Sequence, residues 1–390
     1  MKWKEEVKQS YEDIVLRIPE AVRPVIKPEL LKKAEQKCKD RKGELVAEVD
    51  LITALFEVTP PAFQDQMTDD LEELGIDFDR YLAKVKGDFE HDNDLEQLVK
   101  DMGILCDLVG VEPKEEKIWK VLNAYEPFFR GSPLSIRTTT KPIGKRDVSA
   151  RYVELMMPHK IDPYITALNE GFIEKNGHPI HSLTQEIPEA FQIMGYGVDL
   201  DARVGLAKIW PFIVPDSIDP LFSMEYFPES IKNYESYFKD HNLTIFSVFA
   251  LDFLHNTTNI YFMLKDPSKN SIEECTSLVE ELGFEPASEE VMEKCSEAAH
   301  LNYTFSWDSD RIERLCFGMT CESAEEVPVH FHPLMKKYVG SSPFQSEKKK
   351  FIYGVAFKPD GRYYKIETDY NGTMADFLLM GAKAGIESYK

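Results

Sequence analysis

Regular alternation of polar and apolar residues predicts many half-buried strands in this chain. Residues 300–305, His-Leu-Asn-Tyr-Thr-Phe, place polar side chains on one face and apolar side chains on the other. The same period of two, which is typical of a strand with one buried face, recurs in residues 257–264, 314–320 and 365–370. The polar faces carry single Arg, Lys, Asn and His residues among aromatics. This indicates a closed sheet that is apolar outside and polar inside around a ligand, with a plain sandwich that has one solvated face as the alternative.

Strand pairs and helical segments follow one another from Leu95 onward. Turn signals such as Asp308-Ser-Asp310 and Pro359-Asp-Gly361 separate the two strands of a pair. Antiparallel pairs in series, with helices on their apolar side, predict closure into a barrel. The expected strands are 133–140, 149–157, 191–199, 204–214, 244–252, 257–264, 300–307, 312–320, 350–357 and 363–369. The expected helices are 95–108, 114–127, 162–175, 183–190, 227–240, 271–282, 287–297, 332–338 and 373–388.

Residues 1–85 differ from the remainder because their pattern is helical throughout. The expected helices are 3–18, 29–41, 50–57 and 67–74, the second of them opened by Pro28. The polar, charge-rich stretch 86–94 is expected to be a linker. The predicted fold class is therefore α+β: a ten-stranded antiparallel β-barrel of five αββα units with helices outside (95–390), preceded by a small all-α module (1–85).

Composition disfavours several classes of protein. A hydrophobic content of 43% supports a packed core, and no apolar stretch approaches the ~20 residues of a membrane-spanning helix. The charged start, Met-Lys-Trp-Lys-Glu-Glu, does not resemble a signal peptide, and six scattered cysteines without zinc-ligand spacing indicate reduced thiols. We therefore expect a cytoplasmic protein. A net charge of −22 disfavours nucleic acid and anionic membranes as partners, so basic residues inside strands indicate an internal anion site.

Several short motifs lie on the expected strands and loops of the barrel region, one after another along the chain. They are Asn169-Glu-Gly-Phe172, Gly177-His-Pro179, Gly205-Leu-Ala-Lys208, Asn259-Ile-Tyr-Phe262, Trp307, Arg314-Leu-Cys-Phe317, Ile352-Tyr-Gly354 and Tyr363-Tyr-Lys365. In this order they resemble the soluble aromatic prenyltransferases of bacterial and fungal secondary metabolism, whose αββα units enclose an active site. The resemblance implies transfer of an isoprenyl group, dimethylallyl or geranyl, from its allylic diphosphate to an aromatic small molecule.

The resemblance also implies the ligands of the diphosphate. Fixed positive charge stabilises the pyrophosphate that leaves when an allylic diphosphate ionises. For any one such residue, a solvated surface position or an ion pair is the alternative. The residues that match the family's diphosphate ligands by position, with Arg137 expected to join them, are Lys208, Asn259, Arg314 and Lys365.

An allyl cation must be kept from water and stabilised, and aromatic faces do both. Alternation with Lys208 and Asn259 places several aromatics on the predicted inner faces, although ordinary core packing is the alternative. Asn302 stands where relatives commonly have a diphosphate-contacting tyrosine. The expected prenyl and acceptor pocket consists of Trp210, Phe212, Phe249, Tyr261 and Asn302.

The chain departs from the family pattern at the position where magnesium-dependent relatives bind the metal ion. Magnesium-dependent relatives place an aspartate on the second strand, where this chain is expected to have Tyr152, with Asp147 too far back in the turn. Tyrosine is a poor magnesium ligand, because Mg²⁺ prefers carboxylate and phosphate oxygens. The Asp-Asp-x-x-Asp box of helical prenyl synthases is also absent. We therefore expect neither a metal nor another cofactor, and activity without magnesium.

The acceptor end carries polar residues where relatives usually have small or aromatic ones. Glu154, His300 and Asp369 are expected on inner faces, with Asp369 as the first choice of catalytic base. They indicate a phenol or an aromatic amine as acceptor. A structural hydrogen-bond network among the three is the alternative.

The N-terminal module resembles a different protein. Trp3, Ile18-Pro19, Val22-Arg23 and Ala34 are similar to the small helical domain at the end of a light-independent protochlorophyllide reductase subunit. We expect residues 1–85 to bind a protein partner or to dimerise, with an inert appendage as the alternative. Two further hypotheses concern the whole chain: a non-catalytic barrel that binds an isoprenoid or aromatic ligand, and an interaction protein in which the barrel is a scaffold.

Overall fold

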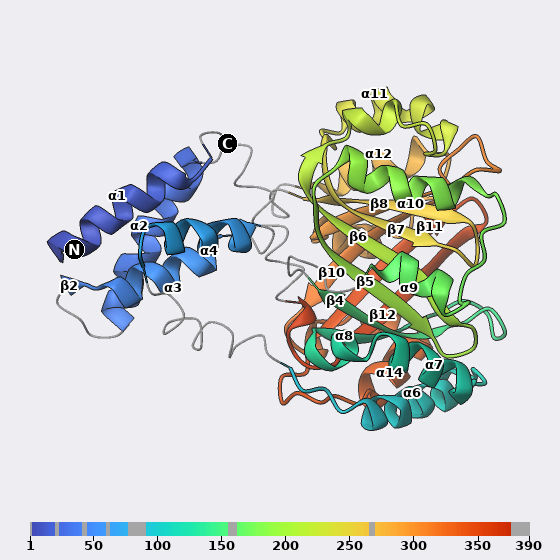
Figure 1. The fold of residues 1–390 in the computed structure, drawn as a ribbon. Helices are drawn as coiled ribbons and strands as arrows, with labels where there is room; N and C mark the ends of the chain where they lie inside the picture. Colours follow the sequence, from blue (N-terminus) through green and yellow to red (C-terminus); the bar gives the residue numbers. More distant parts are fainter. Residues whose placement is uncertain are drawn as a thin grey trace. The chain divides into compact units, whose positions relative to one another are not determined.

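The computed structural model describes residues 2–19, 23–40, 45–59, 63–76, 91–154, 162–264 and 270–375. The chain divides into two compact units, one containing the described residues up to 76 and one beginning at His91. Each unit is described by itself, and Figure 1 labels its elements. The expected linker residues 86–90 lie outside the described residues, as does most of the expected helix 373–388.

The N-terminal unit is helical, as expected. Its helices are α1 (Glu5–Arg17), α2 (Arg23–Asp40), α3 (Glu48–Val58) and α4 (Gln64–Glu73). Apolar residues of all four helices, among them Ile14, Leu30, Leu55 and Leu71, are buried together. Two details differ from the prediction: α2 contains Pro28 instead of starting after it, and two short strands, β1 (Lys2–Trp3) and β2 (Leu45–Val46), pair in parallel.

The second unit contains a closed barrel of ten antiparallel strands, which confirms the predicted fold class (Figure 1). Each strand pairs with its neighbour in the sequence, and pairing of β12 with β3 closes the barrel. The strands are β3 (Leu134–Thr139), β4 (Val148–Glu154), β5 (Ile193–Asp201), β6 (Gly205–Ser217), β7 (Ile245–Asp252), β8 (Thr257–Met263), β9 (His300–Ser306), β10 (Arg314–Cys321), β11 (Phe351–Lys358) and β12 (Gly361–Asp369).

Helices cover the outside of the barrel (Figure 1). Among the described residues they are α6 (Leu95–Val109), α7 (Glu115–Ala124), α8 (Glu126–Gly131), α9 (Pro163–Asn169), α10 (Pro179–Ala190), α11 (Glu235–Asp240), α12 (Ile272–Glu280), α13 (Glu289–Ser296) and α14 (Pro333–Ser341). The predicted helix 227–240 is instead a 3₁₀ turn, Glu229–Tyr234, followed by α11. No helix in the described part of the chain is long and apolar enough to cross a membrane.

The hydrophobic core lies between the barrel wall and these helices. One face of each strand contributes to it, for example Val198, Ile260 and Phe317, and the helices contribute residues such as Leu98 and Leu278. Because side chains alternate along a strand, the intervening residues face the interior of the barrel. The apolar core is therefore outside the barrel, and the polar faces seen in the sequence line its inside.

Candidate active site in the barrel interior

Cross-strand neighbours connect the polar residues of the barrel interior into one surface. Directly opposite residues of antiparallel strands share a face, and Asp199 lies opposite both Arg151 and Lys208. In the same way Thr304 lies opposite both Asn259 and Arg314. The charged or amide-bearing residues of this surface include Arg137, Arg151, Asp199, Lys208, Asp252, Asn259, Asn302, Arg314, Lys365, Glu367 and Asp369.

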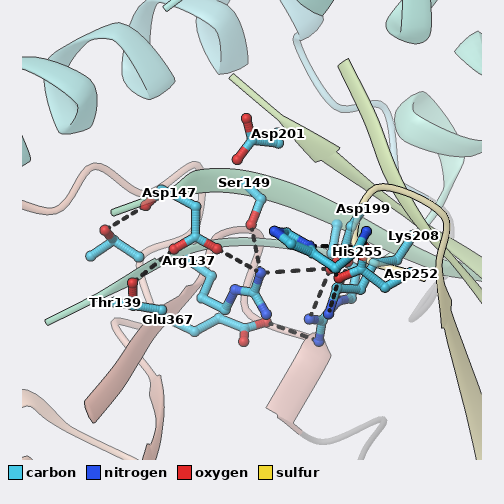
Figure 2. Close-up of polar contacts among 12 residues, drawn as sticks. Arg137, Thr139, Asp147, Ser149, Asp199, Asp201, Lys208, Asp252, His255 and Glu367 are labelled. Carbon is cyan, nitrogen blue, oxygen red and sulfur yellow. Dashed lines mark hydrogen bonds and ion pairs between the residues drawn. The ribbon is translucent and has the colours of Figure 1, made fainter. Parts of the chain in front are cut away.

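Two guanidinium groups of the interior are paired with carboxylates. Arg137 Nη2 lies 3.2 Å from Asp147 Oδ2 and 3.7 Å from Asp199 Oδ2, as Figure 2 shows. Arg151 Nε lies 2.6 Å from Asp199 Oδ1, and its Nη1 lies 3.7 Å from Glu367 Oε1. Burial opposes the charge on Asp199, but Arg151 and Arg137 outweigh it and lower the pKa of this carboxyl. Asp199 thus links the two arginines in a chain of alternating charge.

Lys208 has a carboxylate partner of its own. Its Nζ lies 3.1 Å from Asp252 Oδ2 (Figure 2). Asp252 also accepts a hydrogen bond from the backbone N–H of His255. Burial favours the neutral form of Asp252, but Lys208 and His255 outweigh it and hold its pKa below the usual range.

Three other cations gather around Tyr363 without a carboxylate partner within ion-pair distance among the described residues. Arg314 donates to Tyr363 Oη at 3.1 Å and to Asn259 Oδ1 at 3.4 Å. Lys141 Nζ lies 4.9 Å from the centroid of the Tyr363 ring. Burial, with a contribution from Arg314, lowers the pKa of Lys141 to about 8 despite the opposing effect of Asp147. Burial and Arg314 also lower the pKa of Lys365, to which no described residue offers a hydrogen bond or an ion pair.

Several buried polar atoms of the interior have no hydrogen-bond partner among the described residues. They include Ser135 Oγ, Arg137 Nε, Trp210 Nε1, Asn302 Oδ1, Thr304 Oγ1, Arg314 Nε and Glu367 Oε1. Buried polar groups are ordinarily hydrogen-bonded, and leaving one unpaired costs about 1–3 kcal/mol. Together with the unpaired cations, these atoms indicate a surface built to bind a polar, anionic ligand.

Aromatic side chains form another part of the interior. Trp210 packs against Tyr261 with a centroid distance of 5.2 Å, and Arg151 Cζ lies 4.0 Å from the Trp210 ring centroid. A Cβ placed on Gly197 would lie 3.4 Å from the Phe212 ring, so Phe212 shares this face. Trp210, Phe212, Tyr261 and Asn302 therefore face the interior, as the sequence pattern indicates.

His300 and Asp369 also lie on the inner face, but in different settings. A Cβ on Gly318 would lie 2.2 Å from the His300 ring, so the missing side chain of this glycine makes room for the imidazole. Burial, with Lys365 and Arg151 nearby, lowers the pKa of His300 to about 4, which keeps the ring neutral near pH 7. The two oxygens of Asp369 accept the backbone N–H groups of Met374 and Ala375, each at 2.9 Å.

The comparisons with known proteins agree with this geometry. The family model described as aromatic prenyltransferase Orf2 matches residues 93–382. The chain belongs to this family. It is thus an aromatic prenyltransferase, an enzyme of the transferase class.

Curated relatives of this prenyltransferase come from bacteria and fungi. A 5,10-dihydrophenazine-1-carboxylate 9-dimethylallyltransferase of Streptomyces anulatus is 28% identical over 282 residues, which cover 71% of this chain and 94% of the relative. A flaviolin linalyltransferase of Streptomyces virginiae is 26% identical over 267 residues, which cover 67% of this chain and 88% of the relative. Among solved structures, a 5-dimethylallyl tryptophan synthase from Streptomyces coelicolor has a TM-score of 0.47 and 9% identity, covering 71% of this chain and 95% of that one.

Two predicted site residues of the prenyltransferase lie outside the barrel interior. Phe249 belongs to the outer core, where it contacts Phe191 and Phe246, so it cannot line the prenyl pocket. Glu154 lies on the outer face of β4, since strand alternation places it on the side of Tyr152, which is part of the same core. A carboxylate on that side cannot reach an acceptor inside the barrel, and its proposed catalytic role is wrong.

The expectation for the second strand is wrong by one residue. Tyr152 packs between the barrel and the helices against Phe128 and Phe129, and its neighbour Arg151 faces the interior. Asp147, expected too far back in the turn, reaches the interior and contacts Arg137 and Thr139. The premise that a tyrosine stands at the metal position is therefore wrong.

Sequence reasoning missed Lys141, Arg151 and Asp199 as site residues. Lys141 lies in the turn between β3 and β4, where strand alternation gives no information about direction. Arg151 could have been recognised from Ser149, because the two residues share one face and Ser149 pairs with Arg137. Asp199 and Arg151 are opposite in register, so finding one would have indicated the other.

Proposed function

We propose that this chain transfers an isoprenyl group from an allylic diphosphate to an aromatic acceptor inside the barrel, an alkyl-group transfer. The observation that supports this most directly is the group of cations around Tyr363. Lys141, Arg314 and Lys365 bind the diphosphate in this proposal, with Asn259 orienting Arg314. A group of unpaired cations inside a protein of net charge −22 suits a strongly anionic ligand.

The chemistry assigns a role to the two kinds of side chain. The bond between the allylic carbon and the diphosphate oxygen breaks, and its electron pair leaves with the pyrophosphate. Fixed cations stabilise that developing charge. The faces of Trp210 and Tyr261 stabilise the allyl cation and exclude water from it.

Arg137 and Lys208 have a second role in the proposal. Each is paired with an aspartate in the present structure. We expect the donor phosphates to compete with Asp147 and Asp252 for these cations. Replacement of Arg137 or Lys208 should therefore weaken donor binding less than replacement of Arg314 or Lys365.

Magnesium-independent transfer remains part of the proposal, on a different ground. Arg151 lies on the interior face of β4, and so places a cation on a strand where metal-dependent relatives have an aspartate. The carboxylates of Asp147 and Asp199 are close enough to arginines to be neutralised by them. Since Mg²⁺ needs carboxylate and phosphate oxygens, guanidinium groups take over its charge-neutralising role in this proposal. No metal or other cofactor is required.

For the substrates we propose a dimethylallyl or geranyl donor and a phenol or aromatic amine as acceptor. The Streptomyces anulatus relative is named for a dihydrophenazine carboxylate and a dimethylallyl group, and the Streptomyces virginiae relative for flaviolin. A polar acceptor suits the His300 and Asn302 side chains. His300 remains a candidate acceptor-binding residue, and the expected catalytic role of Asp369 remains a prediction.

The test is product formation from each donor with 5,10-dihydrophenazine-1-carboxylate and with a dihydroxynaphthalene. Prenylated product that depends on enzyme and donor supports the proposal. Binding of a thiolodiphosphate analogue of the donor, without transfer to either acceptor from either donor, would favour a non-catalytic binding barrel.

We also propose the division into a docking module (1–85), a linker (86–94) and a catalytic barrel (95–390). A reducing compartment, the cytoplasm, suits the six cysteines, all of which are buried in the structure. Co-purification of a partner with the full chain, lost in a chain lacking residues 1–85, is the test of the module's role.

A further inference from the structure

The four tryptophans of the chain differ in what their indole N–H groups bind. Trp3 and Trp119 each donate a hydrogen bond to a glutamate side chain, and Trp307 donates to a backbone carbonyl. Trp210 is only 3% exposed, and its Nε1 is buried without a hydrogen-bond partner among the described residues. Because buried polar groups are ordinarily hydrogen-bonded, this N–H indicates a partner that the described part of the chain does not supply.

The neighbours of Trp210 in the barrel interior do not accept this hydrogen bond. Arg151 Cζ lies 4.0 Å from the centroid of the indole ring, but a guanidinium group has only donors. Tyr261 packs against the indole with a centroid distance of 5.2 Å, and no hydrogen bond joins the two side chains. The indole face thus has protein neighbours, whereas the N–H at its edge is left for a ligand.

The indole N–H restricts the chemistry of its partner more than the other unpartnered groups of the interior do. The hydroxyl groups of Ser135 and Thr304 can rotate, and they can donate or accept. The Nε atoms of Arg137 and Arg314 belong to cations, which suit the phosphates of the allylic diphosphate. Trp210 Nε1 is neutral, can only donate and is held in direction by its ring, so its partner is an atom with a free lone pair.

Trp210 lies between the proposed diphosphate site and a candidate acceptor-binding residue. It is two residues from Lys208 on the same face of β6, which is roughly 7 Å along an extended strand. On its other side Tyr261 contacts both Trp210 and His300, the latter with a centroid distance of 5.8 Å. An aromatic acceptor placed beside the allyl group therefore brings its ring substituents within reach of the indole edge.

We propose that Trp210 is a specificity-determining residue that selects aromatic acceptors with a carbonyl or carboxylate oxygen on the ring, an inference that rests on the proposed function. The indole N–H donates to that oxygen, and the indole face stabilises the allyl cation. An acceptor without the oxygen excludes water but leaves the N–H unpaired. A site built to hydrogen-bond a substrate group rejects analogues that lack this group. The substrate class is therefore narrower than phenols and aromatic amines in general.

The experiment uses acceptors that differ in one ring substituent. One series is a dihydroxynaphthalene, its carboxamide and its carboxylate, and the other is 5,10-dihydrophenazine and 5,10-dihydrophenazine-1-carboxylate. Each acceptor is assayed with dimethylallyl and geranyl diphosphate against the full-length wild type, Trp210→Phe and Trp119→Phe. Trp119→Phe is the control, because it removes an indole N–H that belongs to α7 and donates to Glu115. Thermal unfolding of each variant verifies that it is folded.

The quantity compared is the ratio of kcat/KM for a substituted acceptor to kcat/KM for the unsubstituted one. We expect this ratio to be at least about ten in the wild type and in Trp119→Phe. Trp210→Phe retains an aromatic ring, and any change in its effect on the allyl cation applies to all acceptors and cancels in the ratio. The ratio should therefore fall to about one in this variant. A high wild-type ratio for the carboxylate alone would identify an anionic oxygen as the partner, and a high ratio for the carboxamide as well would identify a carbonyl oxygen.

Two results would overturn the role of Trp210. One is a wild-type ratio near one in both series, which would mean that the N–H binds no acceptor oxygen. The other is a wild-type ratio retained by Trp210→Phe, which would assign the preference to another residue. In both cases transfer still takes place. A wild type that transfers to none of the acceptors contradicts the proposed function itself, and the inference then fails with it.

Discussion

Arg151 and Trp210 form a stacked pair on the inner face of the barrel, with the guanidinium carbon 4.0 Å from the ring centroid. Asp199 and Glu367 flank the same guanidinium, at 2.6 and 3.7 Å. A side chain with charged groups on both sides and an aromatic face beneath it has few orientations available. The pair therefore fixes the indole face that we propose to stabilise the allyl cation, and it does so from the strand position that sequence reasoning had assigned to the exterior.

Arg314→Ala and Lys365→Ala should each lower kcat/KM for the allylic diphosphate at least about tenfold. Each contact between a cation and a phosphate contributes ~1.5–3 kcal/mol, and ~1.4 kcal/mol corresponds to a factor of ten. Steady-state kinetics with varied donor is the measurement. Lys337→Ala, an exposed lysine on α14, is the control and should behave as the wild type. Wild-type activity in both interior variants would remove these residues from the site.

Lys141 should make donor use sensitive to pH on the alkaline side. Its pKa is lowered to about 8, mainly by burial, so the ammonium is charged below that value and neutral above it. We therefore expect kcat/KM for the donor to fall as pH rises through about 8 in the free enzyme. Arginine remains charged throughout this range, so Lys141→Arg should move the fall to higher pH. If the wild type and Lys141→Arg show the same dependence of kcat/KM on pH, another group, such as Lys365, causes the fall.

The sequence predicts the inner face of a strand well only where one face is clearly polar and the other is clearly apolar. In β9 polar and apolar residues alternate cleanly, and in β12 the charged Lys365, Glu367 and Asp369 all share one face, so His300, Asn302 and Lys365 are predicted on the correct face. In β4 the sequence Val-Ser-Ala-Arg-Tyr-Val-Glu has polar residues at both parities, and an error of one residue exchanges the two faces. That single error explains why both Glu154 and Tyr152 are predicted on the inner face of β4 although they lie on its outer face.

Other parts of the site could not be predicted from alternation. Phe249 is apolar, and its strand β7 is buried on both sides, so the sequence contains no signal for its direction. Lys141 and Asp147 belong to a turn, where strand periodicity ends. The ion pairs of Arg137 and Lys208 depend on the register of strands, which only the closed barrel defines.

Product formation should continue in EDTA at a rate similar to that in millimolar Mg²⁺. The reason is that Lys141, Arg314 and Lys365 gather around Tyr363 without a carboxylate partner within ion-pair distance in the described part of the chain, so their charges can neutralise a diphosphate without a metal. The assay compares initial rates with EDTA, with Mg²⁺, and with EDTA followed by excess Mg²⁺. Strict dependence on the metal would mean that Asp147 or Asp199 releases its arginine and coordinates the ion instead.

Phe249 and Phe212 provide a matched pair of aromatic residues on opposite faces of the barrel wall. Phe249 is fully buried in the outer core against Phe191, Phe227 and Phe246, so Phe249→Ala should lower the free energy of unfolding by about 3–5 kcal/mol. It should leave the preference for donor and acceptor unchanged, because its side chain does not reach the interior. Phe212→Ala should have the smaller effect on unfolding and should change the KM values or the ratio of transferred to hydrolysed donor.

The two variants are compared by urea unfolding and by kinetics below the temperature at which either unfolds. Substrate preference altered by Phe249→Ala, with unfolding like that of the wild type, would contradict the placement of Phe249 outside the barrel. The opposite pattern for Phe212, a large loss of stability with unchanged kinetics, would exclude it from the prenyl pocket. Because both substitutions remove the same ring, a difference in outcome reports the face of the strand and not the size of the side chain.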